Sequence, residues 1–140
     1  MTFVVAGEAV PQGRPRFMRN GHAYDPQKSR DYKEQVAFAA SWAMRGQSAF
    51  QKGTPLKCAI TIWHKTPARF TKEQKKMVEN ETLRPTSKPD VDNIAKSITD
   101  AMNGIVYADD SQIVELICEK YYAVEPKVMV KVSLCGGKDA

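Results

Sequence analysis

Alternation of apolar and polar residues marks two segments of the chain as strands. Apolar side chains occupy every second position of residues 56–64 and again of residues 127–134, and this period of two buries one face of a strand. Residues 2–10 contain an unbroken apolar run, typical of a strand covered on both sides. Residues 112–123 also have the composition of a strand. We expect this strand and the last one to pair as an antiparallel hairpin, because Glu125-Pro126 makes a turn between them.

Three other segments are predicted to be helical. Residues 25–45 carry apolar side chains three and four positions apart, behind Asp25 as an N-cap. Thr71 is predicted to cap a short helix over residues 72–80. The same apolar spacing predicts a third helix over residues 92–102.

The order of these elements, β-(hairpin)-α-β-α-α-β-β, predicts an α/β (α+β) fold in which helices pack against a mixed sheet. A chain of 140 residues can bury a real core, so we expect residues 1–140 to form a single domain. An apolar content of 42% and a charged content of 26% are ordinary for a globular protein.

Composition excludes several kinds of site. The three cysteines are an odd number without C-x-x-C spacing, so we expect reduced thiols and no zinc site. The two histidines, His22 and His64, are too few to build a histidine-based metal site. The first residues lack the basic start and apolar run of a signal peptide, and no apolar run approaches the roughly 20 residues that span a bilayer. We therefore expect a cytoplasmic protein that does not associate with membranes.

Acidic residues gather in one segment, residues 88–112, of a chain whose formal net charge is +5. Of the 16 acidic residues, five lie there as aspartates: Asp90, Asp92, Asp100, Asp109 and Asp110. In an extended backbone the side chains of Asp90 and Asp92 would point to the same side and converge. We expect Asp92 to be the N-cap of the third helix, with Lys96 one turn later on nearly the same face. Clustered carboxylates repel each other unless a cation relieves them, and Mg²⁺ is the hard cation that suits oxygen ligands.

This segment has a chemical and a structural interpretation. A Mg²⁺ ion could polarise a phosphoryl oxygen and activate water, and Lys96 could stabilise the charge of the transition state. In the structural interpretation Asp92 caps a helix, Asp100 faces solvent and Asp109-Asp110 begin a turn. The structural interpretation is the commoner one for an isolated D-x-D. Only the whole pattern, P-D-x-D-N-x-x-K followed by a helix and D-D-x-Q-I, favours a metal site.

Basic residues precede the acidic segment. Three arginines lie within six residues: Arg14, Arg16 and Arg19. The Asn20-Gly21 turn predicts a hairpin over residues 16–24. Arginine matches phosphate geometry, so this segment is the first candidate for DNA contact, with a solvated basic loop as the alternative. Arg69 and Lys88 could line the route of a phosphodiester to the metal, although solvation alone explains each charge taken singly.

The pattern from Pro89 to Ile113 resembles the RusA family of Holliday junction resolvases, and a looser match covers the P-x-G-R-P-R segment. The resemblance implies that Asp90, Asp92 and Asp110 bind a catalytic Mg²⁺, with Mn²⁺ as an alternative ion. It implies that Lys96 is needed for cleavage and that Asp100 and Asp109 have supporting roles. It further implies a RusA-like fold, a homodimer, branched DNA as substrate, and the cytoplasm of a bacterium or of a phage-infected cell.

The leading hypothesis is therefore a Mg²⁺-dependent endodeoxyribonuclease that resolves Holliday junctions by paired symmetric nicks in DNA recombination and repair. A nuclease for flaps or forks would use the same site. A junction-binding protein without cleavage is disfavoured, because four closely placed charged residues would be costly at a helix end. A phosphatase or nucleotide hydrolase is weaker still, because the chain has no glycine-rich phosphate loop.

Overall fold

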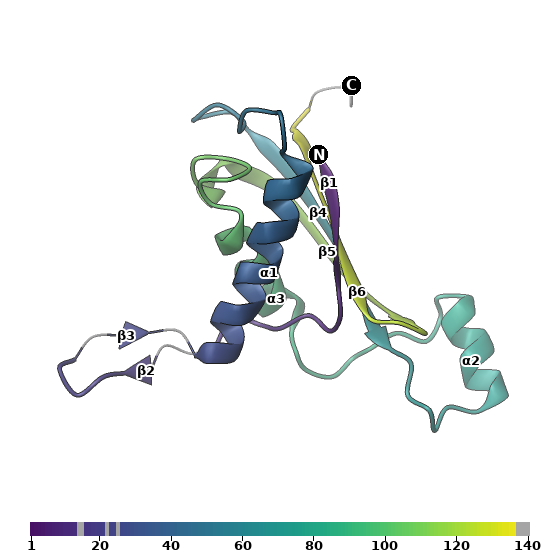
Figure 1. The fold of residues 1–140 in the computed structure, drawn as a ribbon. Helices are drawn as coiled ribbons and strands as arrows, with labels where there is room; N and C mark the ends of the chain where they lie inside the picture. Colours follow the sequence, from purple (N-terminus) through teal and green to yellow (C-terminus); the bar gives the residue numbers. More distant parts are fainter. Residues whose placement is uncertain (14–15, 22, 25, 137–140) are drawn as a thin grey trace.

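One mixed sheet of four strands forms the centre of the computed structural model, which describes residues 1–13, 16–21, 23–24 and 26–136 (Figure 1). Its strands are β1 (Thr2–Ala6), β4 (Leu56–Lys65), β5 (Ile113–Ala123) and β6 (Lys127–Leu134), in the order β1-β6-β4-β5. β4 and β5 run parallel, and the other neighbouring strands run antiparallel. The α+β class and the mixed sheet are confirmed.

The helices are α1 (Gln27–Ala43), α2 (Lys72–Glu79) and α3 (Val91–Ala101), and a 3-10 turn, η1, covers Asp110–Gln112. In Figure 1, α1 and α3 lie on one face of the sheet, and α2 lies beyond one end of it. Thr71 caps α2 as expected: its hydroxyl accepts from the Gln74 N–H, and the Gln74 side chain accepts from the Thr71 N–H. The expected cap Asp25 lies outside the described residues. No helix in the described ranges is long and apolar enough to cross a membrane.

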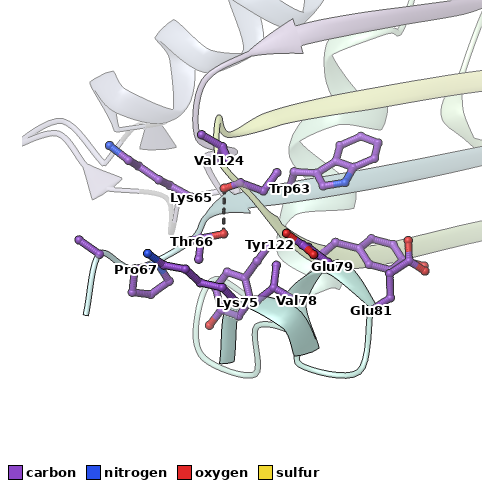
Figure 2. A pocket seen from close by; sticks show the side chains of 13 residues that line it. Trp63, Lys65, Thr66, Pro67, Lys75, Val78, Glu79, Glu81, Tyr122 and Val124 are labelled. Atoms are coloured by element: carbon purple, nitrogen blue, oxygen red, sulfur yellow. Dashed lines mark hydrogen bonds between the residues drawn. The ribbon is translucent and has the colours of Figure 1, made fainter. Parts of the chain in front are cut away.

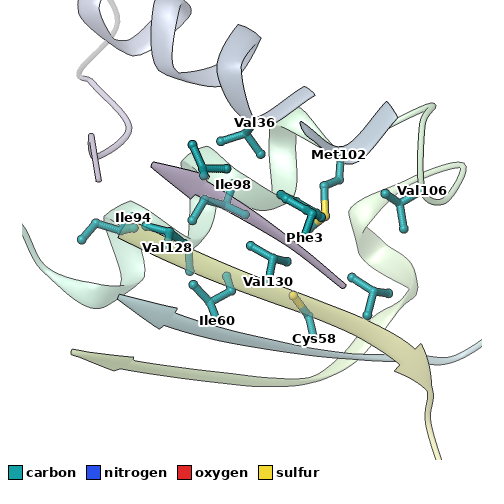
Figure 3. Packing of buried hydrophobic residues seen from close by; sticks show 14 of the residues in the cluster. Phe3, Val36, Cys58, Ile60, Ile94, Ile98, Met102, Val106, Val128 and Val130 are labelled. Carbon is teal, nitrogen blue, oxygen red and sulfur yellow. The ribbon is translucent and has the colours of Figure 1, made fainter. Parts of the chain in front are cut away.

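The core lies between the sheet and the two covering helices (Figure 3). Alternate side chains of β4 and β6 are buried, as the period of two predicts. α1 contributes Val36 and Ala40, and α3 contributes Ile94 and Ile98. Both helices therefore pack on the same face of the sheet.

Two expectations about the strands are wrong. β1 is buried on one side only: Phe3 and Val5 face the core, whereas Val4 is 52% exposed. The reason is that no described helix covers the other face of the sheet. β5 and β6 do not form a hairpin, because β4 lies between them and pairs with both. β5 is therefore an edge strand.

The predicted hairpin over residues 16–24 is confirmed by β2 (Arg16–Phe17) and β3 (Ala23–Tyr24), which pair antiparallel. Figure 1 shows this hairpin extending away from the sheet. A hydroxyl group fastens its base: Ser29 Oγ accepts from the Gly13 N–H at 2.8 Å and donates to the Pro11 carbonyl at 3.1 Å. Near the same place, the Gln12 N–H donates to the Asn93 carbonyl at 3.0 Å. The hairpin is therefore rooted beside the first turn of α3.

Candidate functional site: the two ends of helix α3

Two aspartates lie at the N-terminal end of α3. The Asp90 carbonyl accepts the Ile94 N–H at 3.1 Å, so Asp90 is the N-cap and Asp92 lies in the first turn. The expectation that Asp92 is the cap is therefore wrong, because the N-cap lies two residues earlier. It also follows that residues 90–92 do not continue as an extended segment. Both carboxylates are exposed, and the side chain of Asp90 makes no capping hydrogen bond. The N-terminal end of a helix favours such negative charge.

Strand β5 holds this end of the helix in place. The Lys120 ammonium group donates to the carbonyl oxygens of Ser87 at 2.7 Å and Pro89 at 2.9 Å. Cys118, two residues earlier on the same side of β5, approaches the Val91 carbonyl with its sulfur at 3.6 Å. Burial raises the pKa of the Cys118 thiol to about 11, and the nearby negative charges of Glu119 and Asp92 act in the same direction. Cys118 thus contacts the first turn of α3, in which Asp92 lies.

Lys96 follows Asp92 by four residues on α3, which is slightly more than one turn, and its side chain is exposed like that of Asp92. Further along the helix, the Lys33 ammonium group of α1 forms an ion pair with Asp100 at 3.3 Å. Lys33 thus compensates charge at the C-terminal end of α3, while Lys96 lies nearer the N-terminal end.

Asp110 lies at the C-terminal end of α3. Burial and the negative charges of Asp109 and Asp100 raise the pKa of the Asp110 carboxyl, and a hydrogen bond with Asn103 opposes this shift. Asp109 has a structural role: its carboxylate caps η1 by accepting from Ser111, and this interaction lowers its pKa. The structure thus places Asp110 beside Asp100.

The Gln112 side chain fixes this second acidic cluster. Its oxygen accepts from the Ala108 and Asp109 N–H groups, and its amide nitrogen donates to the carbonyls of Gln51 and Thr54. The Tyr107 hydroxyl donates to the Thr99 carbonyl of α3 at 2.7 Å. These contacts hold the segment after α3 against the end of the helix.

The predicted metal ligands are thus distributed over both ends of α3. Eight residues separate Asp92 from Asp100, which corresponds to about 12 Å of helix axis. Within the parts of the chain that the structure describes, no three Asp, Glu, His or Cys side chains form a group that could hold a metal ion. Asp90 and Asp92 still fit Mg²⁺ in ligand type, because Mg²⁺ often uses one or two carboxylates and keeps its waters. The ligand set of Asp90, Asp92 and Asp110 stays a prediction.

The four basic residues predicted to contact DNA lie in separate parts of the chain. Arg14 lies outside the described residues, and Arg16 is described only as the first residue of β2. Lys88 is exposed two residues before Asp90. Arg69 is exposed in the loop before α2, with its guanidinium 5.3 Å from the ring centre of Phe70. The two hydrogen bonds from Lys120 to the Ser87 and Pro89 carbonyls, called the Lys120 clamp below, were not predicted from the sequence. Nothing in the local pattern of β5 indicates them.

Comparison with known proteins identifies the family of the chain. The chain matches the family described as Endodeoxyribonuclease RusA over residues 6–133. It is 42% identical over 135 residues to the uncharacterized protein YqaN of Bacillus subtilis (strain 168), covering 93% of each chain. It is 30% identical over 88 residues to the crossover junction endodeoxyribonuclease rusA of Lactococcus phage r1t, covering 62% of this chain and 60% of the phage protein. The chain belongs to the RusA endodeoxyribonuclease family.

Proposed function

We propose that this protein is a Mg²⁺-dependent, structure-selective endodeoxyribonuclease that resolves four-way DNA junctions by paired symmetric nicks. The observation that carries the proposal is the family match over residues 6–133, which includes both acidic motifs and Lys96. A role in DNA recombination and repair follows from this substrate. The protein would act in the cytoplasm of a bacterium or of a phage-infected cell.

In this proposal Asp90 and Asp92 would hold the metal from the N-terminal end of α3. Asp110 stays the third predicted ligand, although in the described chain it lies beside Asp100 at the other end of this helix. Bound Mg²⁺, or Mn²⁺ in its place, would supply a polarised phosphoryl oxygen and an activated water. The ammonium group of Lys96 stabilises the negative charge that builds on the phosphate. The clamp formed by Lys120 positions Asp90 through the carbonyl of Pro89.

Basic residues would hold the DNA backbone without reading its bases. Lys88 is exposed beside Asp90, and the hairpin that bears Arg16 is rooted at the first turn of α3 through Gln12. Arg14 and Arg69 are the other predicted contacts. Such phosphate contacts make binding weaken as salt rises.

The proposal includes a homodimer, because two symmetry-related strands need two active sites. Analytical ultracentrifugation tests it directly: a dimer has twice the monomer mass of 15.7 kDa. A species that stays at the monomer mass on the junction and in free solution would contradict this part of the proposal.

The decisive experiment compares cleavage of a synthetic four-way junction, a flap, a fork and a linear duplex, with Mg²⁺ and with EDTA. Asp92→Asn is the test variant and Glu73→Gln the matched control, because each residue is the acidic residue in the first turn of its helix. We expect paired nicks in the junction alone, abolished by EDTA and Asp92→Asn and retained in Glu73→Gln.

The other outcomes identify the alternatives. Preferred cutting of the flap or fork indicates a nuclease for other branched DNA. Equal cutting of the linear duplex indicates a general nuclease. Tight junction binding without cutting in any divalent metal would leave a junction-binding protein.

A further inference from the structure

A pocket of about 500 Å³ lies between α2 and the neighbouring ends of β4 and β5 (Figure 2). Trp63 of β4 and Tyr121 of β5 line it side by side, in register, with ring centres 6.5 Å apart and planes inclined by 31°. Tyr122 also lines the pocket and packs edge-on against Phe70, with ring centres 5.3 Å apart. The pocket therefore has aromatic walls held by a strand pair, and its volume is typical of sites for small organic ligands.

Charged groups surround these rings. The Arg84 guanidinium lies 4.2 Å from the ring centre of Tyr121, and the Lys127 ammonium nitrogen lies 5.0 Å from that of Trp63. Lys65 and Lys75 line the pocket with exposed side chains. Positive charge beside partly exposed aromatic rings suits a ligand that has both a flat π system and an anionic group.

The acidic residues of the pocket lie apart from its lysines. In Figure 2 the Lys65 and Lys75 side chains lie on one side, and those of Glu79 and Glu81 lie on the other. A carboxylate accepts hydrogen bonds from an N–H group at the edge of a nucleobase and repels a phosphate. The charges therefore define an orientation, with a phosphate at the lysines and a base edge toward the glutamates.

We propose that this pocket binds one unpaired nucleotide of a DNA strand, with its base stacked on Trp63 and Tyr121 and its phosphate at Lys65 and Lys75. The inference rests on the proposed function for the source of that strand, because a branch point would supply an unpaired nucleotide when a base pair there opens. Stacking tolerates every base, so the pocket would select unpaired structure and not sequence.

The position of the pocket links it to the candidate active site. Tyr121 directly follows Lys120, the residue that clamps the Pro89 carbonyl beside Asp90. Arg84, which covers the Tyr121 ring, donates through Nε to the Lys120 carbonyl at 2.9 Å. Successive side chains of a strand point to opposite faces, so Lys120 holds the N-terminal end of α3 on one face of β5 and Tyr121 lines the pocket on the other. A strand captured in the pocket would therefore pass around this edge strand to reach Asp90 and Asp92.

Tryptophan fluorescence tests this inference without cleavage. Trp42 and Trp63 are the two tryptophans of the chain, so Trp42→Phe leaves Trp63 as the reporter. In EDTA, we expect a short single-stranded oligothymidylate to quench Trp63, and a duplex of the same length to quench it at least tenfold less at equal concentration. Thymidine monophosphate that binds as tightly as the oligonucleotide would overturn a DNA-strand site, as would quenching by an apolar peptide and not by DNA.

Two variants test the residues. Fluorescence anisotropy of a labelled oligonucleotide measures the variants, because Trp63→Leu removes the tryptophan reporter. Trp63→Leu should weaken binding of the oligonucleotide by about 5- to 100-fold, the effect of losing one base–aromatic stack. Lys75→Glu, on the exposed surface of α2, should also weaken binding, and its circular dichroism should match that of the wild-type protein. The matched control is Trp42→Leu: Trp42 is exposed, has the Arg45 guanidinium 4.5 Å from its ring centre, and does not line the pocket. Its affinity should be unchanged.

The two proposals fail separately. Junction cleavage that persists while Trp63→Leu and Lys75→Glu bind single strands as the wild type does would overturn the pocket and leave the nuclease. Quenching and variant effects as expected, in a protein that cuts no DNA, would support the pocket and overturn the nuclease.

Discussion

The ammonium group of Lys120 donates to the carbonyl oxygen of Pro89 at 2.9 Å and so joins strand β5 to the residue before Asp90. The same group also donates to the Ser87 carbonyl at 2.7 Å. One side chain therefore satisfies two carbonyls of the loop that leads into α3. Asp90 and Asp92 follow directly, so the position of the candidate metal ligands depends on a residue that binds neither metal nor DNA in the proposed mechanism.

Lys120→Met should lower both stability and cleavage. Hydrogen bonds that involve a charged group contribute about 1.5–3 kcal/mol. Because these bonds are partly exposed, we expect the free energy of unfolding to fall by about 1–2 kcal/mol. Cleavage should fall further than junction binding, because the carboxylates lose their position. Urea denaturation and single-turnover cleavage measure the two effects. Lys57→Met, on the neighbouring strand β4, is the control, and equal urea midpoints for both variants would contradict the clamp.

Removing either the hydrogen-bond donor or the acceptor of the Gln112 side chain should lower the free energy of unfolding. Its side chain is buried, accepts from Ala108 and donates to the Gln51 carbonyl at 2.9 Å. Gln112→Glu keeps the acceptor and loses the donor, so we expect a loss of about 1–3 kcal/mol, the cost of an unsatisfied buried group. Gln74→Glu is the control, because Gln74 only accepts, from the Thr71 N–H. Thermal unfolding of the two variants should differ, and equal midpoints would show that the Gln112 donor contributes nothing.

The thiols should react slowly at neutral pH. Burial raises the pKa of Cys58 from 9.0 to about 12 and that of Cys118 to about 11. A raised pKa keeps the thiol protonated, so at pH 8 about 0.1% of Cys118 is the reactive thiolate, against roughly 10% at a pKa of 9. We expect alkylation of Cys118 to accelerate about tenfold per pH unit from pH 7 to 10, with Cys58 slower throughout. Mass spectrometry of iodoacetamide-treated protein measures this, and rapid labelling of Cys58 in the folded protein would contradict its burial.

Local patterns predicted much of the fold. The alternation in residues 56–64 identified β4 and its buried face, and the motif around Thr71 identified the start of α2. Both depend on neighbours within a few residues. The pairing of β5 could not be predicted in this way, because its partner residues on β4 lie nearly 60 positions earlier, as in the pair Lys57 and Glu115, and because β4 separates β5 from β6.

In the candidate site, too, features set by neighbouring residues could be predicted and features set by distant contacts could not. The sequence identified Asp90, Asp92 and Lys96 as residues of one helix end, and the structure places them on α3. It did not predict that Asp110 would lie beside Asp100. That placement depends on contacts formed only in the folded chain, such as the Tyr107 hydroxyl on the Thr99 carbonyl. The spacing of residues along the sequence does not predict such contacts.

Lys88→Ala should weaken junction binding to a similar extent on every junction sequence. Lys88 is exposed beside Asp90, where the proposed function places a phosphate, and a phosphate contact carries no base information. Removing one such contact should reduce the slope of log affinity against log salt by about 1. Fluorescence anisotropy at several salt concentrations, in EDTA, gives both quantities.

Lys57→Ala is the matched control for Lys88→Ala. It removes the same charge from β4, on the sheet face that no described helix covers, and its slope should equal that of the wild type. If both variants lowered the slope equally, the effect would come from net charge and not from a contact. If Lys88→Ala changed affinity for one junction sequence and not for another, Lys88 would be reading bases. A reduced slope for Lys88→Ala alone would place the DNA backbone at the N-terminal end of α3, within reach of Asp90 and Asp92.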